Sequence, residues 1–137
     1  MSTQTQGDLE SLIRERLSLI PYTKLLGIEL ESVTPGLVTL GMDVRADLKR
    51  NNGIAHGGAI ASLIDSATAF AIISQDPGQS AVTIDLTVSF LKPLVDGRAT
   101  ATARVIRSGR RVAVVSAEVF DKGQNLVATA LSTYIKD

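Results

Sequence analysis

The sequence predicts an α+β domain in which a curved antiparallel β-sheet wraps around one long central α-helix. Residues 56–74 are rich in Ala and Ile and are apolar on nearly every side, and a helix of that kind is normally buried. Four strand-like runs joined by short turns follow this segment, and strands joined by short turns are antiparallel. A sheet curved around the helix is the economical way to bury both elements.

Before this helix, the pattern predicts an amphipathic helix, a hairpin and a loop. Apolar residues recur at helical spacing over residues 8–20, and Pro21 ends the run. Residues 27–33 and 37–44 are two strand-like runs on either side of a Pro-Gly turn signal. Residues 45–55 form a polar loop that leads into the central helix.

The later strands are predicted from alternation and turn signals. Residues 81–91 alternate strictly, with apolar side chains at the even positions from Val82 to Phe90. Alternation of that kind predicts one shared apolar face, with Thr83 and its polar neighbours on the other face. The remaining strands are expected at residues 98–107, 111–120 and 126–135.

The composition indicates one domain over residues 1–137, with residues 1–20 as part of it. The absence of Cys and the single His rule out disulfides, a Cys nucleophile and a multi-His centre within one chain, so no metal or cofactor is expected. Lys and Arg equal Asp and Glu at 14 each, which argues against nucleic-acid binding. With no signal-peptide pattern and no apolar run near the roughly 20 residues of a membrane span, a cytoplasmic protein without membrane contact is expected.

Asp65 is the first candidate for chemistry because it falls in the middle of the apolar helix. Ser62, Asp65 and Ser66 are spaced by three and four residues and so form one narrow polar stripe. Ionised carboxylates are rarely buried without a partner. Asp65 is either a structural group that pairs with a cation or faces water, or a general base or nucleophile tuned by partial burial.

The segment His56-Gly57-Gly58 at the predicted helix start is the second candidate. Glycines there leave bare N–H groups at the positive end of the helix dipole, where they can hold a developing oxyanion. Alternatively, they serve only the geometry of a tight loop-to-helix junction. Gly57 and Asp65 lie about 12 Å apart along a helix, so one carbonyl cannot touch both groups of one chain. If both act on one substrate, they come from different subunits, which favours a dimer.

A third feature is the predicted hairpin turn Arg107-Ser108-Gly109-Arg110-Arg111. Three Arg residues make a local cationic site on a chain whose net charge is zero. Such charges usually belong to a solvated turn, and the functional alternative is recognition of the phosphates of a nucleotide-bearing ligand.

Together these residues resemble the hotdog-fold thioesterase superfamily, and in particular its PaaI-like group of acyl-CoA thioesterases. The resemblance rests on the pattern Gly53-x-x-His56-Gly57-Gly58 followed by Asp65 in a helix, and it extends over residues 20–137. Further agreement comes from residues 83–88, 91–93, 108–111 and 118–119, and from Asp121 and Tyr134.

The resemblance implies a hotdog fold and a homodimer with a continuous sheet, often doubled into a homotetramer. It also implies hydrolysis of an acyl-CoA thioester to a free acid and CoA. In that reaction Asp65 activates water or attacks the carbonyl, and the Gly57 N–H donates to the thioester oxygen. His56 helps hold the substrate and the loop, and Thr83 helps place the water. Gly58 and the Arg-rich turn are then candidate substrate contacts.

The chain departs from the family pattern at one position. The family usually has an Asn six residues before its His, where this chain has Arg50. Either the loop geometry lets Asn51 substitute as a substrate contact, or that contact is missing.

Two other functions fit a hotdog domain. One is a non-catalytic acyl-CoA-binding module, which the zero net charge and the lack of an attached DNA-binding segment make the weaker candidate. The other is a dehydratase acting on acyl-ACP, which pairs a His with an acidic residue, as His56 and Asp65 would. The spacing from the glycines to Asp65 fits the thioesterases better.

Overall fold

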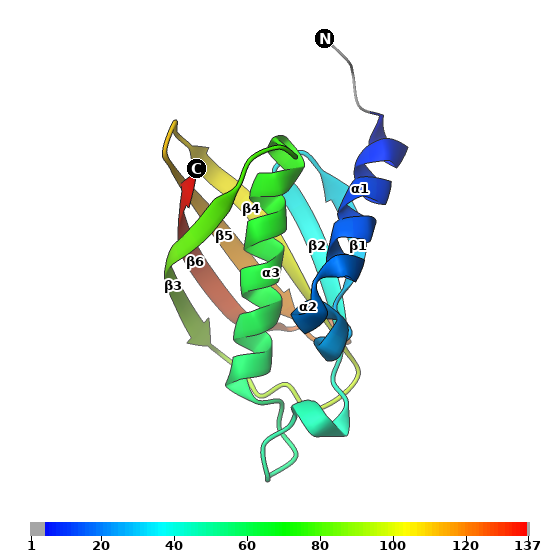
Figure 1. Ribbon diagram of the computed structural model, residues 1–137. Helices are drawn as coiled ribbons and strands as arrows, with labels where there is room; N and C mark the ends of the chain where they lie inside the picture. Colours follow the sequence, from blue (N-terminus) through cyan, green and yellow to red (C-terminus); the bar gives the residue numbers. More distant parts are fainter. Residues whose placement is uncertain (1–4, 137) are drawn as a thin grey trace.

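The computed structural model describes residues 5–136 and shows a sheet curved around one long helix, α3 (Gly57–Gln75) (Figure 1). All strand pairs are antiparallel, in the order β1-β2-β4-β5-β6-β3. The predicted α+β fold class is therefore confirmed. The strands are β1 (Glu29–Thr34), β2 (Leu37–Asp43), β3 (Ala81–Phe90), β4 (Arg98–Ser108), β5 (Val112–Phe120) and β6 (Leu126–Lys136).

The N-terminal segment contains two helices rather than one. α1 (Gln6–Leu19) buries Leu9, Ile13 and Leu17, as the amphipathic pattern predicts, and it packs beside β1. Pro21 ends this helix and also begins a second one, α2 (Pro21–Leu26). The sequence pattern did not predict α2, because proline suits the first turn of a helix as well as the end of another. The loop before α3 contains one 3₁₀ turn, Ala46–Leu48.

α3 lies at the centre of the core. It is long and apolar enough to cross a membrane by length and composition alone, but most of its surface is covered by the sheet and by α1. Short side chains on the inner face of β4 and β5 let the helix approach closely. Ala99, Ala101, Ala103, Ala113 and Ala117 are all at most 2% exposed.

A β-bulge in β3 interrupts the strict alternation expected for residues 81–91. Between Thr83 and Asp85 the register with β6 shifts by one residue, so Ile84 is extra. Val82 and Ile84 are 60% and 57% exposed, whereas Leu86 packs against the core. The prediction that these three side chains share a face was wrong, because one inserted residue reverses the faces on its far side.

One buried hydroxyl ties α3 to the turn between β1 and β2. The Ser74 Oγ donates to the Ala71 carbonyl at 2.7 Å and accepts from the Gly36 N–H at 2.8 Å. Gly36 is buried and has a φ of 81°, a conformation that favours glycine. The turn therefore depends on this side chain for its buried N–H.

We expect Ser74→Ala to lower the free energy of unfolding by about 1–3 kcal/mol, because it leaves the buried Gly36 N–H without an acceptor. Urea denaturation monitored by circular dichroism measures the change. Ser66→Ala is the matched control, since the half-buried Ser66 Oγ bonds only within α3, to the Ser62 carbonyl. Equal losses in the two variants would contradict this account.

Candidate functional site

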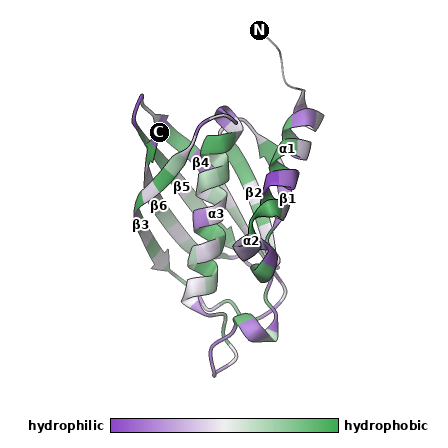
Figure 2. Cartoon of the chain, viewed as in Figure 1, coloured by the Kyte–Doolittle hydropathy of each residue, from purple (hydrophilic) through white to green (hydrophobic). Residues whose placement is uncertain are grey.

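The polar stripe predicted on α3 lies on the half-buried side of the helix. Ser62, Asp65 and Ser66 are half-buried, while Leu63, Ile64 and Ala67 between them are fully buried. Figure 2 shows this as a hydrophilic patch midway along an otherwise apolar helix. The stripe is therefore only partly covered, with the Tyr22 hydroxyl of α2 2.8 Å from the Ser62 Oγ.

The carboxylate of Asp65 accepts hydrogen bonds from two strands. The Thr83 hydroxyl of β3 donates to Oδ1 at 2.9 Å, and the Tyr134 hydroxyl of β6 lies 3.1 Å from the same oxygen. The bulge at Ile84 is what lets Thr83 face the helix on the same side of β3 as Leu86. Asp65 and Thr83, two of the residues singled out from the sequence, are thus brought together.

Tyr134 was missed as a site residue by the sequence analysis. It is 1% exposed, and its hydroxyl is also 2.6 Å from the Thr68 Oγ. Burial raises the pKa of Tyr134, and hydrogen bonds to neighbouring hydroxyls only partly oppose this shift. The phenol therefore stays protonated and remains a donor at neutral pH. Alternation along β6 would have placed Tyr134 on the inner face beside Ser132, which was the available signal.

His56 is the N-cap of α3. Its Nδ1 accepts from the Gly58 N–H at 2.8 Å, so that N–H is used within the chain. The N–H of Gly57 has no acceptor among residues 5–136. A side chain at Gly57 would meet the ring of Phe90 at 3.4 Å. The helix start therefore presents one free backbone donor beside an aromatic ring.

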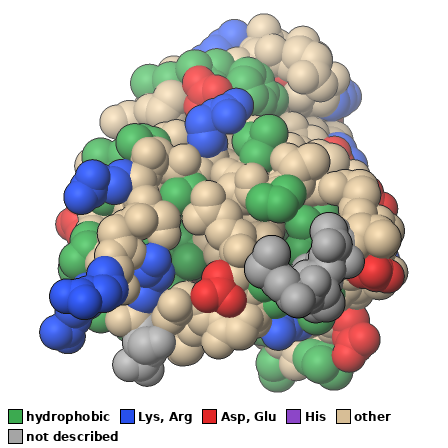
Figure 3. Space-filling view, turned by 90° about the horizontal axis from the view of Figure 1, so that it is seen from above, with side chains coloured by type: hydrophobic (Ala, Val, Ile, Leu, Met, Phe, Trp, Pro, Cys, Tyr) green, Lys and Arg blue, Asp and Glu red, His purple; other side chains and the backbone are tan. Residues whose placement is uncertain are grey.

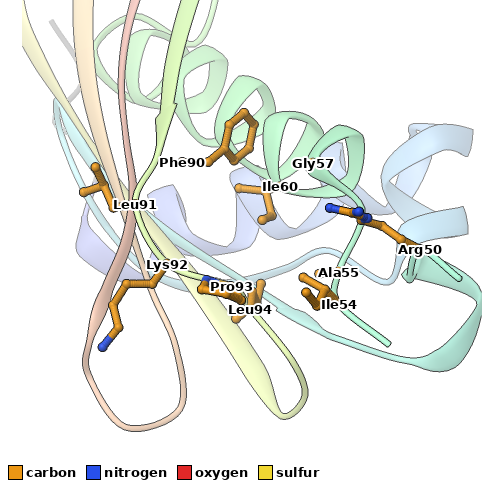
Figure 4. Close-up of a pocket in the computed structure, with 10 residues that line it drawn as sticks. All are labelled: Arg50, Ile54, Ala55, Gly57, Ile60, Phe90, Leu91, Lys92, Pro93 and Leu94. Carbon is orange, nitrogen blue, oxygen red and sulfur yellow. The ribbon is translucent and has the colours of Figure 1, made fainter. Parts of the chain in front are cut away.

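A pocket of about 420 Å³ opens beside Gly57 (Figure 4). Ile60 and Phe90 form part of its apolar lining, and the Arg50 side chain extends toward Gly57. Asn51, proposed from the sequence as a substrate contact, is exposed and does not line this pocket. Arg50, six residues before His56, lines the pocket instead.

The Arg-rich turn lies at the other end of the molecule. Arg107 and Ser108 end β4, and residues 109–111 connect it to β5, near the C-terminal end of α3 and away from Gly57 (Figure 1). Lys136 adds a further cation there, since its Nζ donates to the Ser108 Oγ at 2.8 Å. Figure 3, which views the molecule from this end, shows Lys and Arg side chains gathered along one side.

Gly57 and Asp65 lie on one uninterrupted helix. Eight residues of α-helix span about 12 Å, so the Gly57 N–H and the Asp65 carboxylate of one chain do not converge. The described part of the chain contains no group of His, Asp and Glu residues able to hold a metal ion.

Comparison with known families identifies the class of protein. A model of the thioesterase superfamily matches residues 52–128, which is more than half of the chain. The chain belongs to the thioesterase superfamily, whose fold is the hotdog fold described above.

Named relatives and solved structures agree with this assignment. The chain is 37% identical to the acyl-coenzyme A thioesterase PaaI of Escherichia coli over 77% of this chain and 74% of PaaI. It is 33% identical to the medium/long-chain acyl-CoA thioesterase YigI of Salmonella typhimurium over 85% of each. A putative esterase of Saccharolobus solfataricus is 35% identical over 91% of this chain and 83% of its own length. The solved structure of E. coli PaaI superposes with a TM-score of 0.86 at 30% identity, covering 94% of this chain and 96% of PaaI.

Proposed function

We propose that this protein is a homodimeric acyl-CoA thioesterase that hydrolyses an acyl-CoA thioester to a free acid and CoA. The observation that carries the proposal is the carboxylate of Asp65, which stands on an apolar helix and is held by Thr83 and Tyr134. Relatives named as acyl-CoA thioesterases, PaaI and YigI, support the substrate class.

In the proposed reaction Asp65 acts as a general base. It takes a proton from water while the water oxygen bonds to the thioester carbon. The carbonyl oxygen becomes an oxyanion, which the Gly57 N–H and the positive end of α3 stabilise. The C–S bond then breaks, and the proton held by Asp65 passes to the departing thiolate of CoA. Direct attack by Asp65, through an anhydride that water hydrolyses, uses the same groups.

His56 and Thr83 hold these groups in place. The Nδ1 of His56 is engaged by the Gly58 N–H, and this cap keeps the free N–H of Gly57 at the helix start. The hydroxyl of Thr83 donates to Oδ1 of Asp65 and so fixes the carboxylate relative to the attacking water. We propose that both residues act by positioning.

We propose that each site combines Gly57 of one subunit with Asp65 of the other. Two antiparallel α3 helices around a two-fold axis would bring the start of each near the middle of its partner. β3 lies at the edge of the sheet and exposes Val82 and Ile84, and an apolar unpaired edge favours strand pairing with a second copy. Exposed Leu131 on the outer sheet face supports further assembly into a homotetramer.

The Arg-rich turn is the proposed site for the phosphates of CoA. In an antiparallel dimer, the turn at the C-terminal end of α3 in one subunit lies toward the Gly57 end of the other. Arg107, Arg110 and Arg111 are exposed there and suit phosphate oxygens. Further proposed substrate contacts are made by Ser108, Gly109, Gly58 and Asn51.

We expect Asp65→Asn to lower the rate of thiol release from acyl-CoA by about 10²-fold or more, because the amide cannot accept the proton from water. The assay uses a panel of aryl-, short- and medium-chain acyl-CoA substrates. Asp85→Asn is the matched control, since Asp85 is an exposed carboxylate of β3. Turnover near that of the wild type in Asp65→Asn would remove Asp65 from the mechanism, and binding of acyl-CoA without turnover by the wild type would favour a non-catalytic module.

Arg110→Ala should raise KM for acyl-CoA with kcat largely kept, because a phosphate contact binds substrate and transition state equally. Steady-state kinetics with the best substrate of the panel measures both constants. Arg104→Ala, at an exposed Arg of β4 outside the turn, serves as the control. An unchanged KM in the Ala variants of Arg107, Arg110 and Arg111 would show that these residues belong to a solvated turn and do not bind the phosphates of CoA.

A further inference from the structure

Two buried hydroxyls stand behind the carboxylate of Asp65. Tyr134 is 1% exposed and Thr68 is fully buried. The Tyr134 hydroxyl lies 3.1 Å from Oδ1 of Asp65 and 2.6 Å from the Thr68 Oγ. Thr68 follows Asp65 by one helical turn, whereas Tyr134 reaches the same point from β6. Each hydrogen of two buried hydroxyls needs an acceptor. The orientation of the Thr68 hydroxyl therefore constrains that of the Tyr134 hydroxyl.

The two oxygens of the carboxylate have different surroundings. Oδ1 receives Thr83 and Tyr134, whereas Oδ2 has no hydrogen-bond donor among residues 5–136. Every buried side-chain oxygen and nitrogen in the described chain has a partner, so Oδ2, which has none, is not buried. Oδ1 is therefore the held oxygen, and Oδ2 is the oxygen that a water or a thioester can reach.

The Tyr134 hydroxyl also lies 3.1 Å from the backbone carbonyl oxygen of Asp65, so its hydrogen has three possible acceptors. Two of the resulting arrangements differ in whether Oδ1 or Thr68 accepts that hydrogen. In the first, Thr68 donates to Tyr134, and Tyr134 donates to Oδ1, which suits an ionised carboxylate. In the second, Tyr134 donates to Thr68, and Thr68 donates to the backbone carbonyl of Asp65, 3.1 Å away. The second arrangement withdraws a donor from Oδ1 and suits a carboxylate that has just taken a proton. Both arrangements keep each buried hydrogen bonded.

No Lys, Arg or His side chain forms an ion pair with the Asp65 carboxylate in the described part of the chain. None of the ion pairs among residues 5–136 includes Asp65. Hydrogen bonds to a charged group are among the strongest in proteins. The hydroxyls of Thr83 and Tyr134 are therefore the groups that stabilise the charge of Asp65 on an apolar helix.

We propose that Tyr134 is a positioning residue for Asp65, and that Thr68 and Tyr134 form one hydrogen-bond relay whose direction follows the protonation of Asp65 while Oδ2 does the chemistry. This inference rests on the proposed role of Asp65 in thioester hydrolysis. Tyr134 lies behind the carboxylate and does not touch the substrate, so its effect falls on kcat and leaves KM unchanged.

The test is a double-mutant cycle in steady-state thioester hydrolysis. Tyr134→Phe removes only the hydroxyl and should lower kcat by about tenfold to a hundredfold, the effect of losing one hydrogen bond to a charged group. Thr68→Val should lower kcat less, and Thr68→Ser, which keeps the hydroxyl, should restore it. Because Thr68 acts through Tyr134, the double variant Tyr134→Phe/Thr68→Val should be no slower than Tyr134→Phe alone.

The control is Ser74→Ala, which removes another buried hydroxyl from the core. The Ser74 Oγ bonds to the Ala71 carbonyl and the Gly36 N–H, nine residues beyond Asp65 along α3. It should cost stability without changing kcat. Urea denaturation of each variant separates loss of fold from loss of rate, and Thr68→Val compared with Thr68→Ser decides the case if Tyr134→Phe does not fold.

The outcomes distinguish the inference from the function on which it rests. Wild-type kcat in Tyr134→Phe together with an inactive Asp65→Asn would overturn the positioning role and leave the proposed function standing. Losses that multiply in the double variant would show that the two hydroxyls act independently and would overturn the relay. An active Asp65→Asn would instead refute the proposed function itself.

Discussion

A helix of 19 residues that is apolar on nearly every side has to be covered, and the rest of the fold follows from covering it. The sheet curves around α3, alanines on β4 and β5 let it pack closely, and α1 covers another part of it. The stripe with Asp65 lies on the half-buried side of the helix. There the Asp65 carboxylate accepts hydrogen bonds from the Thr83 and Tyr134 hydroxyls through Oδ1, while Oδ2 has no donor among the described residues. The same constraint that builds the core therefore also defines where a substrate could approach.

Most of the fold was predictable from patterns along the chain. The long apolar helix, the hairpin and the four later strands all depend on local periodicity and turn residues, and these match the structure closely. Two features depend on information that periodicity lacks. α2 begins at Pro21, where proline suits both a helix end and a helix start. The bulge at Ile84 is set by pairing with β6, and alternation alone gives no sign of an extra residue.

The candidate site shows the same division. Asp65 stands out in the sequence because it is a carboxylate on an apolar helix. The glycines after His56 stand out because two of them occur in a row at the start of that helix. Thr83 came only from the family resemblance, and strict alternation set it on the face opposite the apolar side chains; the bulge is what allows it to reach Asp65. Tyr134 carries no such conflict, since an aromatic residue in a strand is ordinary, and its importance comes from a contact 69 positions away in sequence.

Mixed dimers test the central claim, that Gly57 and Asp65 of different subunits form one site. The variants Asp65→Asn and Gly57→Pro are each expected to be inactive on their own. Proline is tolerated at the first position of a helix, and it removes the donor N–H of Gly57. The two variants are unfolded, refolded together in equal amounts and checked for mixed dimers by native mass spectrometry. Random pairing gives half mixed dimers with one intact site each, so we expect about a quarter of wild-type acyl-CoA hydrolysis. Mixed dimers that form but release no CoA would contradict a site shared between subunits.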